Sequence, residues 1–312
     1  GQFLDLDGRT DGVHRVGVGH GLHAHRRVAA HRDHTRSPHH AGLAAAPDVD
    51  MLRAIEPLAD RLVHRQAAVG VAHVGRRRRV VYGPGAVIAV FQPNQYYANH
   101  EKYLSALADA MATEYEAIVA SGLELQIDAP DLAMGRHIRF RDASDDEFMT
   151  AAEQQVEALN HALRNVPADR VRMHICWGNY EGPHHHDIEL KRIIGLVCKA
   201  KPATILFEGA NPRHAHEWEV WADAQKKGQL PDNKILCPGV LDSVNNFIEH
   251  PRLIAQRLLT YANIVGRERV MAGTDCGFGT FAGYGAIHPS IGFAKLKSMS
   301  EGAAMASKEL WS

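Results

Sequence analysis

Short apolar runs alternate with amphipathic helical segments over most of this 312-residue chain, and the alternation predicts an α/β fold with a parallel sheet. Six strand–helix units follow residue 83 in succession. Polar side chains suited to metal or substrate binding gather where several of the strands should end, which is typical of a (β/α)8 barrel of the TIM type. We therefore predict such a barrel, with its first two strand–helix units missing or garbled. An open α/β sheet is the alternative.

The units follow one another in a regular order. The first expected strand is 85–91, and the helix after it spans 101–121, where Leu104, Leu107 and Met111 keep helical spacing. Gly122 ends this helix. The later strands and helices are expected at 123–128 and 145–165, at 171–176 and 187–199, at 204–208 and 214–227, at 234–240 and 251–265, and at 270–273 with a helix after Pro289.

Residues 1–82 differ in composition from the barrel domain that we assign to residues 83–312. This Arg- and His-rich segment holds 13 Arg and 10 His but no Lys, and only 50–66 has the pattern of a helix. The composition favours translation in the wrong reading frame or a misassigned start. A disordered extension and a poorly patterned domain start are the other interpretations. A nucleic-acid-binding arm is disfavoured, because the segment has no aromatic platform and no repeated motif.

The overall composition argues against several classes of protein. A formal net charge of −1 predicts neither a nucleic-acid nor a membrane partner. No apolar run approaches the roughly 18 residues that span a bilayer, and the start of the chain lacks the pattern of a signal peptide, so we expect a cytoplasmic protein. Four cysteines are too few for a disulfide framework in a chain of this length, and a reducing compartment suits thiolate metal ligands.

Four residues near expected strand ends form a candidate metal site. Because side chains of a strand alternate between two faces, His174 and Cys176 share one face of the strand at 171–176. Glu208 ends the next apolar run, and Cys276 follows a later one. An imidazole, two thiolates and a carboxylate are a common set of zinc ligands. These residues predict a zinc site, against the alternative of buried polar residues and inert core thiols.

Loop residues beside the same strand ends are candidates for substrate binding. Trp177 and Asn179 would line a pocket with a stacking face and a polar anchor, although core or loop packing explains them equally well. Arg213 would bind a substrate carboxylate or sulfonate, against packing at a helix start. Asp242 would orient a substrate or make a turn.

Other histidines, acids and thiols have weaker signals. The run at 184–186 would close over a substrate or donate protons, or it is a solvated loop. Asp275 would orient a metal ligand without binding the metal itself. Cys198 and Cys237 are expected to be core thiols.

Four features of the sequence carry a family resemblance, namely the pair of His174 and Cys176, Glu208, and the segments at 126–130 and 273–278. With them, the chain resembles the cobalamin-independent methionine synthase family, in its short single-barrel branch, over roughly residues 84–312. The resemblance implies that zinc binds the sulfur of homocysteine and that the thiolate attacks the methyl group of 5-methyltetrahydrofolate. It also implies that Asp128 holds the amino group of homocysteine, against a capping or loop role for this carboxylate.

The chain departs from the family pattern near residue 244. In the family the pattern that starts at 239–242 leads to a catalytic histidine, and the corresponding residue here is Val244, so we assign no catalytic residue. Short-branch relatives resemble epoxyalkane:coenzyme M transferase, in which a zinc-bound thiolate opens an epoxide. The sequence thus predicts zinc-dependent transfer of a methyl or alkyl group to a small-molecule thiol. Epoxide opening by the same thiolate and an inactive zinc-binding barrel remnant are the alternatives.

Overall fold

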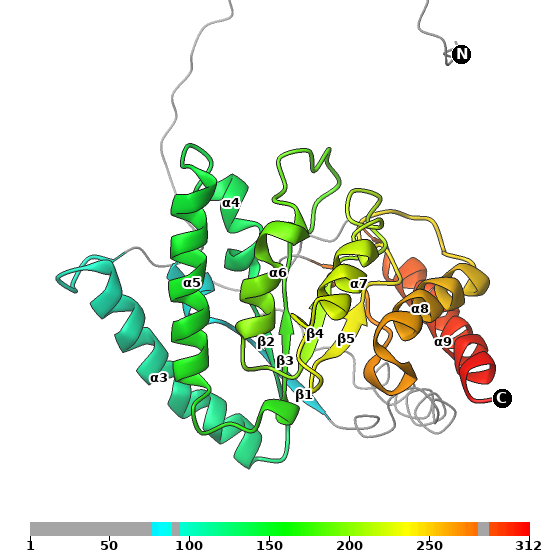
Figure 1. Ribbon diagram of the computed structural model, residues 1–312, viewed down its shortest axis with the longest axis horizontal. Helices are drawn as coiled ribbons and strands as arrows, with labels where there is room; N and C mark the ends of the chain where they lie inside the picture. Colours follow the sequence, from blue (N-terminus) through cyan, green and yellow to red (C-terminus); the bar gives the residue numbers. More distant parts are fainter. Residues whose placement is uncertain (1–76, 89–93, 280–286) are drawn as a thin grey trace, which may run out of the picture. The chain divides into compact units, whose positions relative to one another are not determined.

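A parallel β-sheet whose strands follow one another in chain order organises the structure. The computed structural model describes residues 77–88, 94–279 and 287–312 (Figure 1). Five strands pair in the order β1-β2-β3-β4-β5, and every pairing is parallel. They are β1 (Arg78–Tyr82), β2 (Glu124–Asp128), β3 (Val171–His174), β4 (Thr204–Phe207) and β5 (Ile235–Pro238). The predicted α/β class with a parallel sheet is confirmed.

A sixth segment continues the sheet beyond β5. Leu236 forms a parallel bridge with Val270, and Gly239 forms one with Gly273. The backbone N–H of Val240 donates to the Gly273 carbonyl at 2.9 Å. Pairings among the described residues do not join this segment to β1, so they do not close the sheet into a ring.

The first strand differs from the sequence prediction. We expected a strand at 85–91, but the described part of that range is helical and begins with α2 (Pro84–Ala86). Pro84 favours a helix start, because its fixed φ suits the first helical position and its missing N–H would have no partner there. The strand at this place is β1, whose Arg78 contacts Glu124 of β2 at 2.8 Å. The sheet therefore begins five residues before the predicted domain boundary. Our expectations for 1–76 lie outside the described residues.

Helices follow the strands as the periodicity predicts. The longer helices and one short turn are α3 (His100–Ala120), α4 (Gly135–Ile138), α5 (Asp145–Ala162), α6 (Leu190–Lys199), α7 (Trp218–Lys226), α8 (Pro251–Val265) and α9 (Pro289–Leu310). Short 3-10 turns are η3 (Pro130–Leu132), η4 (Ala168–Arg170) and η5 (Arg267–Arg269). Among the residues that the structure describes, no helix is long and apolar enough to cross a membrane.

Polar caps fix the starts of four of these helices. Ser144 and Glu147 form a capping box at α5, in which each side chain accepts a hydrogen bond from the other residue's backbone N–H. Asn99 caps α3 with its side chain. His250 and His288 cap α8 and α9 in the same way, each followed by a proline at the first helical position.

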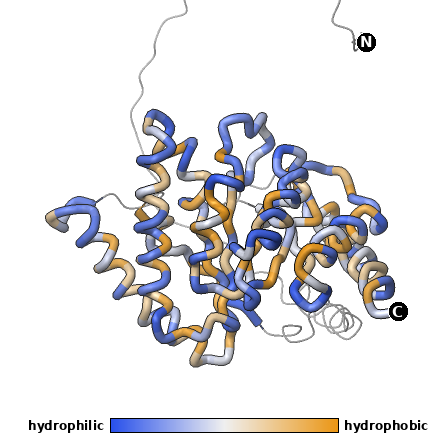
Figure 2. Tube along the Cα trace, viewed as in Figure 1, coloured by the Kyte–Doolittle hydropathy of each residue, from blue (hydrophilic) through white to orange (hydrophobic). Residues whose placement is uncertain are grey.

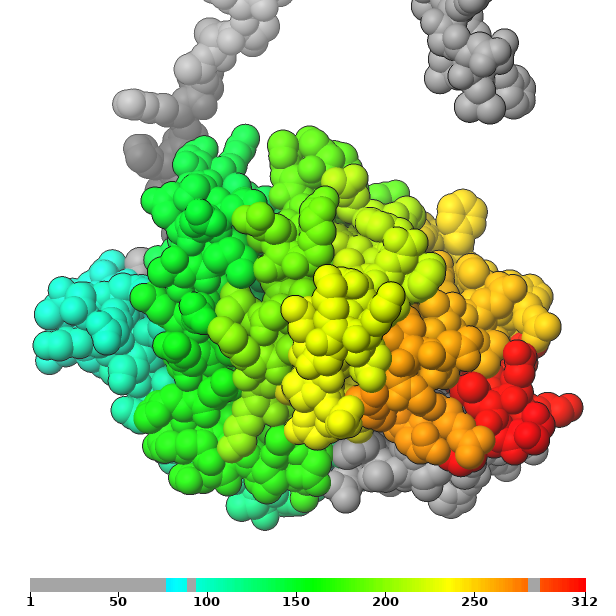
Figure 3. Space-filling model, viewed as in Figure 1, coloured from blue at the N-terminus to red at the C-terminus, as the bar shows by residue number. Residues whose placement is uncertain are grey.

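The main core lies between the sheet and its covering helices. Leu125, Ile127 and Met173 are fully buried strand residues, and Figure 2 shows apolar residues along the strands. In Figure 3 the helices from α5 to α8 cover this face of the sheet. Because strand side chains alternate, the residues between these apolar ones point to the opposite face. Asp128 and His174 are such residues, and they pair across β2 and β3.

Loss of a core aromatic side chain tests this packing. Phe148 on α5 is fully buried and meets Phe140 edge-on at 5.7 Å between ring centroids. Because the truncation leaves a cavity, Phe148→Ala should lower the free energy of unfolding by about 3–5 kcal/mol, measured by urea denaturation. Phe247→Ala is the matched control, because that ring is 81% exposed and its loss should cost less than about 0.5 kcal/mol. Equal losses from the two variants would contradict the assigned core.

Candidate metal centre

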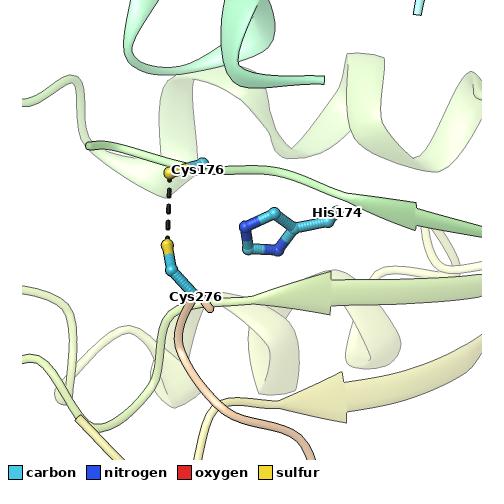
Figure 4. Close-up of side chains that lie close together, drawn as sticks. All are labelled: His174, Cys176 and Cys276. Atoms are coloured by element: carbon cyan, nitrogen blue, oxygen red, sulfur yellow. Dashed lines mark hydrogen bonds between the residues drawn. The ribbon is translucent and has the colours of Figure 1, made fainter. Parts of the chain in front are cut away.

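Three of the four predicted ligands meet at the carboxyl ends of the strands. His174 ends β3, Cys176 follows two residues later, and Cys276 comes after the sixth segment (Figure 4). Their ligand atoms all lie within 4.8 Å of one another. The two sulfurs are 3.3 Å apart, and both cysteines are buried. An imidazole nitrogen with two sulfurs is a donor set that suits a thiophilic metal ion, so the three side chains fit one such ion.

The cluster favours one thiolate beside a histidine. The hydrogen bond from Cys276 holds the pKa of the Cys176 thiol well below its usual range, against the opposing effect of burial. The same hydrogen bond, with burial, raises the pKa of Cys276 well above its usual range. Burial disfavours a charged His174, but its hydrogen bond to Cys176 and the negative charge there outweigh burial and raise its pKa. The surroundings of Cys176 therefore favour a deprotonated, electron-rich sulfur.

Glu208 lies beside this cluster but is not one of the three converging groups. It follows β4 directly and is buried. Its Oε1 accepts from the Trp177 backbone N–H at 2.9 Å, and its Oε2 accepts from the Asn211 side chain at 2.8 Å. Burial first, and then the charge of Cys176, raise the pKa of this carboxyl. Its predicted role as a metal ligand stays a prediction.

Asp275 positions the loop after β4 and does not touch the cluster through its own carboxylate. Its Oδ1 accepts from the backbone N–H groups of Gly209 and Ala210 at 2.8 and 2.9 Å, and its Oδ2 accepts from Asn211 at 2.6 Å. Burial raises the pKa of Asp275 to about 7. Gly239 must be glycine here, because a Cβ atom would lie 1.9 Å from Asp275 Oδ1. Asp275 therefore fixes the loop that follows Glu208.

Asn179 joins three loops through its side-chain amide. Its amide nitrogen donates to the Gly277 carbonyl at 2.8 Å, and its amide oxygen accepts from the Ser243 hydroxyl at 2.9 Å. The same hydroxyl accepts from the Cys276 backbone N–H at 3.2 Å. Sequence reasoning missed Ser243, because no local pattern links a serine after β5 to a cysteine 33 residues later.

The other predicted substrate residues have mixed outcomes. Trp177 is fully buried, its indole N–H donates to the Ile188 carbonyl at 2.7 Å, and its ring packs on His214 at 4.3 Å, so it lies in the core and not on a pocket wall. Asp242 makes a turn, accepting from the backbone N–H of Val244 at 2.8 Å. Arg213 is exposed, and Asp128 is half-buried beside His174.

The two remaining cysteines behave as core thiols. Cys198 on α6 and Cys237 in β5 are buried, and burial raises the pKa of both. Neither belongs to a group of possible metal ligands among the described residues.

A second buried cluster lies next to Trp177, and sequence reasoning did not assemble it. Asp187 Oδ2 contacts His184 Nδ1 at 2.7 Å and His214 Nε2 at 2.9 Å. The other ring nitrogen of His214 contacts Glu217 Oε2 at 2.8 Å. His184 adopts a φ of +51°, uncommon for a residue other than glycine. The cluster ties the loop after β3 to the loop after β4, and only the run of histidines at 184–186 signalled it in the sequence.

The chain is similar in sequence to several known enzymes. The methionine synthase of Sulfurisphaera tokodaii is 21% identical over 246 residues, covering 78% of this chain and 60% of that protein. The methionine synthase of Thermococcus kodakarensis is 25% identical over 226 residues, covering 72% and 55%. The 2-hydroxypropyl-CoM lyase of Xanthobacter autotrophicus is 27% identical over 143 residues, covering 39% and 38%. The chain thus spans about 60% or less of the length of these relatives.

A solved structure supports the fold. The B12-independent methionine synthase of a Shewanella species, in complex with selenomethionine, matches with a TM-score of 0.58 at 17% identity, over 81% of this chain and 67% of that one. No family model matches the chain.

Fold and cluster together define an α/β protein with a candidate metal centre at the ends of its parallel strands. Within that class, the resemblance to cobalamin-independent methionine synthases and to the epoxyalkane:coenzyme M transferase type is confirmed as a similarity, and the predicted fold class is confirmed with it.

The second cluster predicts a pH-dependent contribution to stability. Burial opposes a charged His214, but its contacts with Asp187 and Glu217 raise its pKa to about 9. A raised pKa stabilises the fold fully below the unfolded value, about 6.5, and this contribution is lost as the pH rises through about 9. His214→Gln should therefore lower the free energy of unfolding by up to about 3 kcal/mol at pH 6, and by less above pH 9.

Urea denaturation across this pH range measures the effect. The control is His161→Gln, because His161 contacts Asp109 at 2.7 Å on the surface and both side chains are about half exposed. It should change stability by less than about 1 kcal/mol. A His214→Gln loss that does not depend on pH would contradict the charged network.

Proposed function

We propose that this chain binds zinc through His174, Cys176 and Cys276 and transfers a methyl or alkyl group to a small-molecule thiol, as in methionine synthases. The observation that carries the proposal is the convergence of these three donors at the strand ends. The similarity to methionine synthases and to a CoM lyase supports it, because both names denote enzymes that act on sulfur compounds. A cytoplasmic location belongs to the proposal, because a reducing compartment keeps both thiols free to bind metal.

The proposed roles of the protein residues follow from their contacts. Zinc would supply a positive charge that holds a substrate thiol as its thiolate. Glu208 is the proposed fourth ligand, and it would give way to that thiolate, because a softer sulfur competes better for such a metal. The displaced carboxylate would keep hydrogen bonds from the Trp177 backbone and the Asn211 side chain. Exchange of Glu208 for the substrate therefore leaves no buried charge without a partner.

The proposed thiol substrate resembles homocysteine, with a methyl donor of the methyltetrahydrofolate type. Asp128 would bind the ammonium group of the thiol compound. Burial raises the pKa of this carboxyl, and its side chain accepts one long contact, 3.5 Å, from Gln126. A cation beside it would therefore stabilise its charged form. Arg213, exposed on the loop after β4, would bind a carboxylate of a substrate.

Opening of an epoxide by the same thiolate is the second candidate reaction. The similarity to 2-hydroxypropyl-CoM lyase over 143 residues favours it, as does Val244 at the position where the methionine synthase pattern leads to a histidine. Both reactions use one sulfur nucleophile and differ in the electrophile that is consumed.

Zinc content tests the proposed metal ligands. Protein purified without added metal should hold one zinc ion per chain by elemental analysis, because the three donors converge on one point. Cys176→Ser and Cys276→Ser should each lose most of it. Cys198→Ser is the matched control, because this buried thiol lies outside the cluster and its variant should keep the metal. Retention of zinc in both cluster variants would rule out the site.

Cobalt substitution tests the thiol chemistry. Addition of homocysteine or 2-mercaptoethanol to cobalt-loaded protein should increase the sulfur-to-metal absorption, because the substrate sulfur becomes a ligand. Proton release should accompany binding, since the thiol must lose its proton to bind the metal. Glu208→Gln should bind the thiol at least as tightly as the wild type. Absence of both signals with several thiols would leave only a structural metal site or an inactive barrel.

A further inference from the structure

Any thiol alkylation of this kind has to move a proton, and His174, Cys176 and Cys276 would all be bound to the metal. The thiol loses a proton when it becomes a thiolate, and the leaving atom of most donors gains one. The position at which the family pattern places its histidine holds Val244, whose side chain has no ionisable proton. The proposed reaction therefore requires an acid–base residue other than these metal ligands.

His137 on α4 lies next to the cluster and is the histidine best placed for this role. The backbone N–H of Met134, at the start of α4, donates to the Cys176 carbonyl at 2.9 Å, so this helix is tied to the ligand loop. The His137 side chain is 14% exposed, whereas those of His184 and His214 are 5% and 3% exposed. Of these three imidazoles, that of His137 is the most exposed.

The carboxylate of Asp187 lies next to the ring of His137. Its Oδ1 lies 3.2 Å from His137 Nδ1, within ion-pair distance, and neither atom forms a hydrogen bond with any of the described residues. Its Oδ2 is held by His184 and His214, at 2.7 and 2.9 Å. The carboxylate is thereby fixed in orientation, with one oxygen directed at His137. A carboxylate at Nδ1 sets the tautomer of a histidine and leaves Nε2 to exchange a proton.

We propose that His137 is the acid–base residue of this site, with Asp187 as its positioning residue; the inference rests on the proposed thiol alkylation. In the reaction, Nε2 of His137 accepts the proton of the incoming S–H group as the thiol becomes a thiolate. The sulfur then forms its bond to the donor carbon while the bond from that carbon to its nitrogen or oxygen breaks. His137 passes the thiol proton to solvent, which is the proton release expected on thiol binding, and once protonated again from solvent it donates a proton to that nitrogen or oxygen. A thiol and an alkyl donor are thus converted into a thioether and a protonated leaving group.

The charges around His137 suit a group that starts neutral. Burial lowers its pKa, and the nearby His184 and His186 lower it further, while Asp187 and Cys176 oppose this by raising it. The ring of Tyr180 packs near it, edge-on, at 6.4 Å between centroids. A neutral imidazole can accept the thiol proton, and the carboxylate of Asp187 then stabilises the imidazolium until the proton is delivered.

Two electrophiles that differ in their need for a proton test the role. With 2-mercaptoethanol as the thiol, 1,2-epoxypropane gives an alkoxide that must be protonated, whereas methyl iodide releases iodide, which needs no proton. His137→Gln in the zinc-loaded protein should slow the epoxypropane reaction by about 100-fold or more. The methyl iodide reaction, measured where the bound thiol is already ionised, should change by less than about threefold. Asp187→Asn should act in the same direction and move the pH profile of the epoxypropane rate to lower pH, because Asp187 raises the pKa of His137.

The controls separate this inference from the proposed function. His161→Gln removes a histidine–aspartate contact on the surface and should leave both rates unchanged. Thiol binding to cobalt-loaded His137→Gln should give the wild-type spectrum, which shows that the metal site and the fold are intact. Equal loss with both electrophiles, or epoxypropane rates equal to the wild type, would overturn the role of His137 while thiol binding stands. A wild-type protein that binds no thiol would instead overturn the proposed function, and this inference with it.

Discussion

The rest of the site depends on the hydrogen bonds that the buried carboxylate of Asp275 accepts. It accepts three hydrogen bonds from successive backbone N–H groups of the loop after β4, and it is the chain neighbour of Cys276. One residue thereby sets the distance between the segment that bears a sulfur ligand and the loop that bears Glu208. The bare backbone of Gly239 makes room for this carboxylate, because a side chain there would overlap it. The positions of the cluster residues therefore depend on the backbone of these loops more than on contacts among their own side chains.

The site divides into two neighbouring environments of different chemistry. The cluster of His174, Cys176 and Cys276 is rich in sulfur and suits a soft metal ion. The cluster of His184, Asp187 and His214 consists of nitrogen and oxygen atoms at hydrogen-bond distances, with protons between them. Trp177 separates them and packs on His214, while its backbone N–H reaches Glu208. The two clusters therefore offer different donor atoms, sulfur in one and only nitrogen and oxygen in the other, at the same end of the sheet.

Much of this arrangement was predictable from the sequence, because strand periodicity is local. The alternation at 171–176 placed His174 and Cys176 on one face, and the parallel order of strands brought Cys276 to the same edge. The roles of Trp177 and Asn179 were not predictable, because they depend on how three loops from distant parts of the chain meet. The first strand was misplaced, because the sheet already includes residues before the change in composition at residue 83 and Pro84 starts a helix. The buried pair of Asp187 and His214 spans 27 residues and leaves no local pattern.

The position of β1 has a practical consequence for producing the protein in the laboratory. A shortened gene that begins at residue 83, where the composition changes, would delete a strand that pairs with β2 over its whole length. The backbone N–H of Glu124 would also lose the Arg77 carbonyl, its partner at 3.0 Å. The freed edge of β2 would then be open to pairing with other chains, a common origin of insoluble protein. An expression clone should therefore start upstream of Arg77, inside a stretch that composition alone would suggest removing.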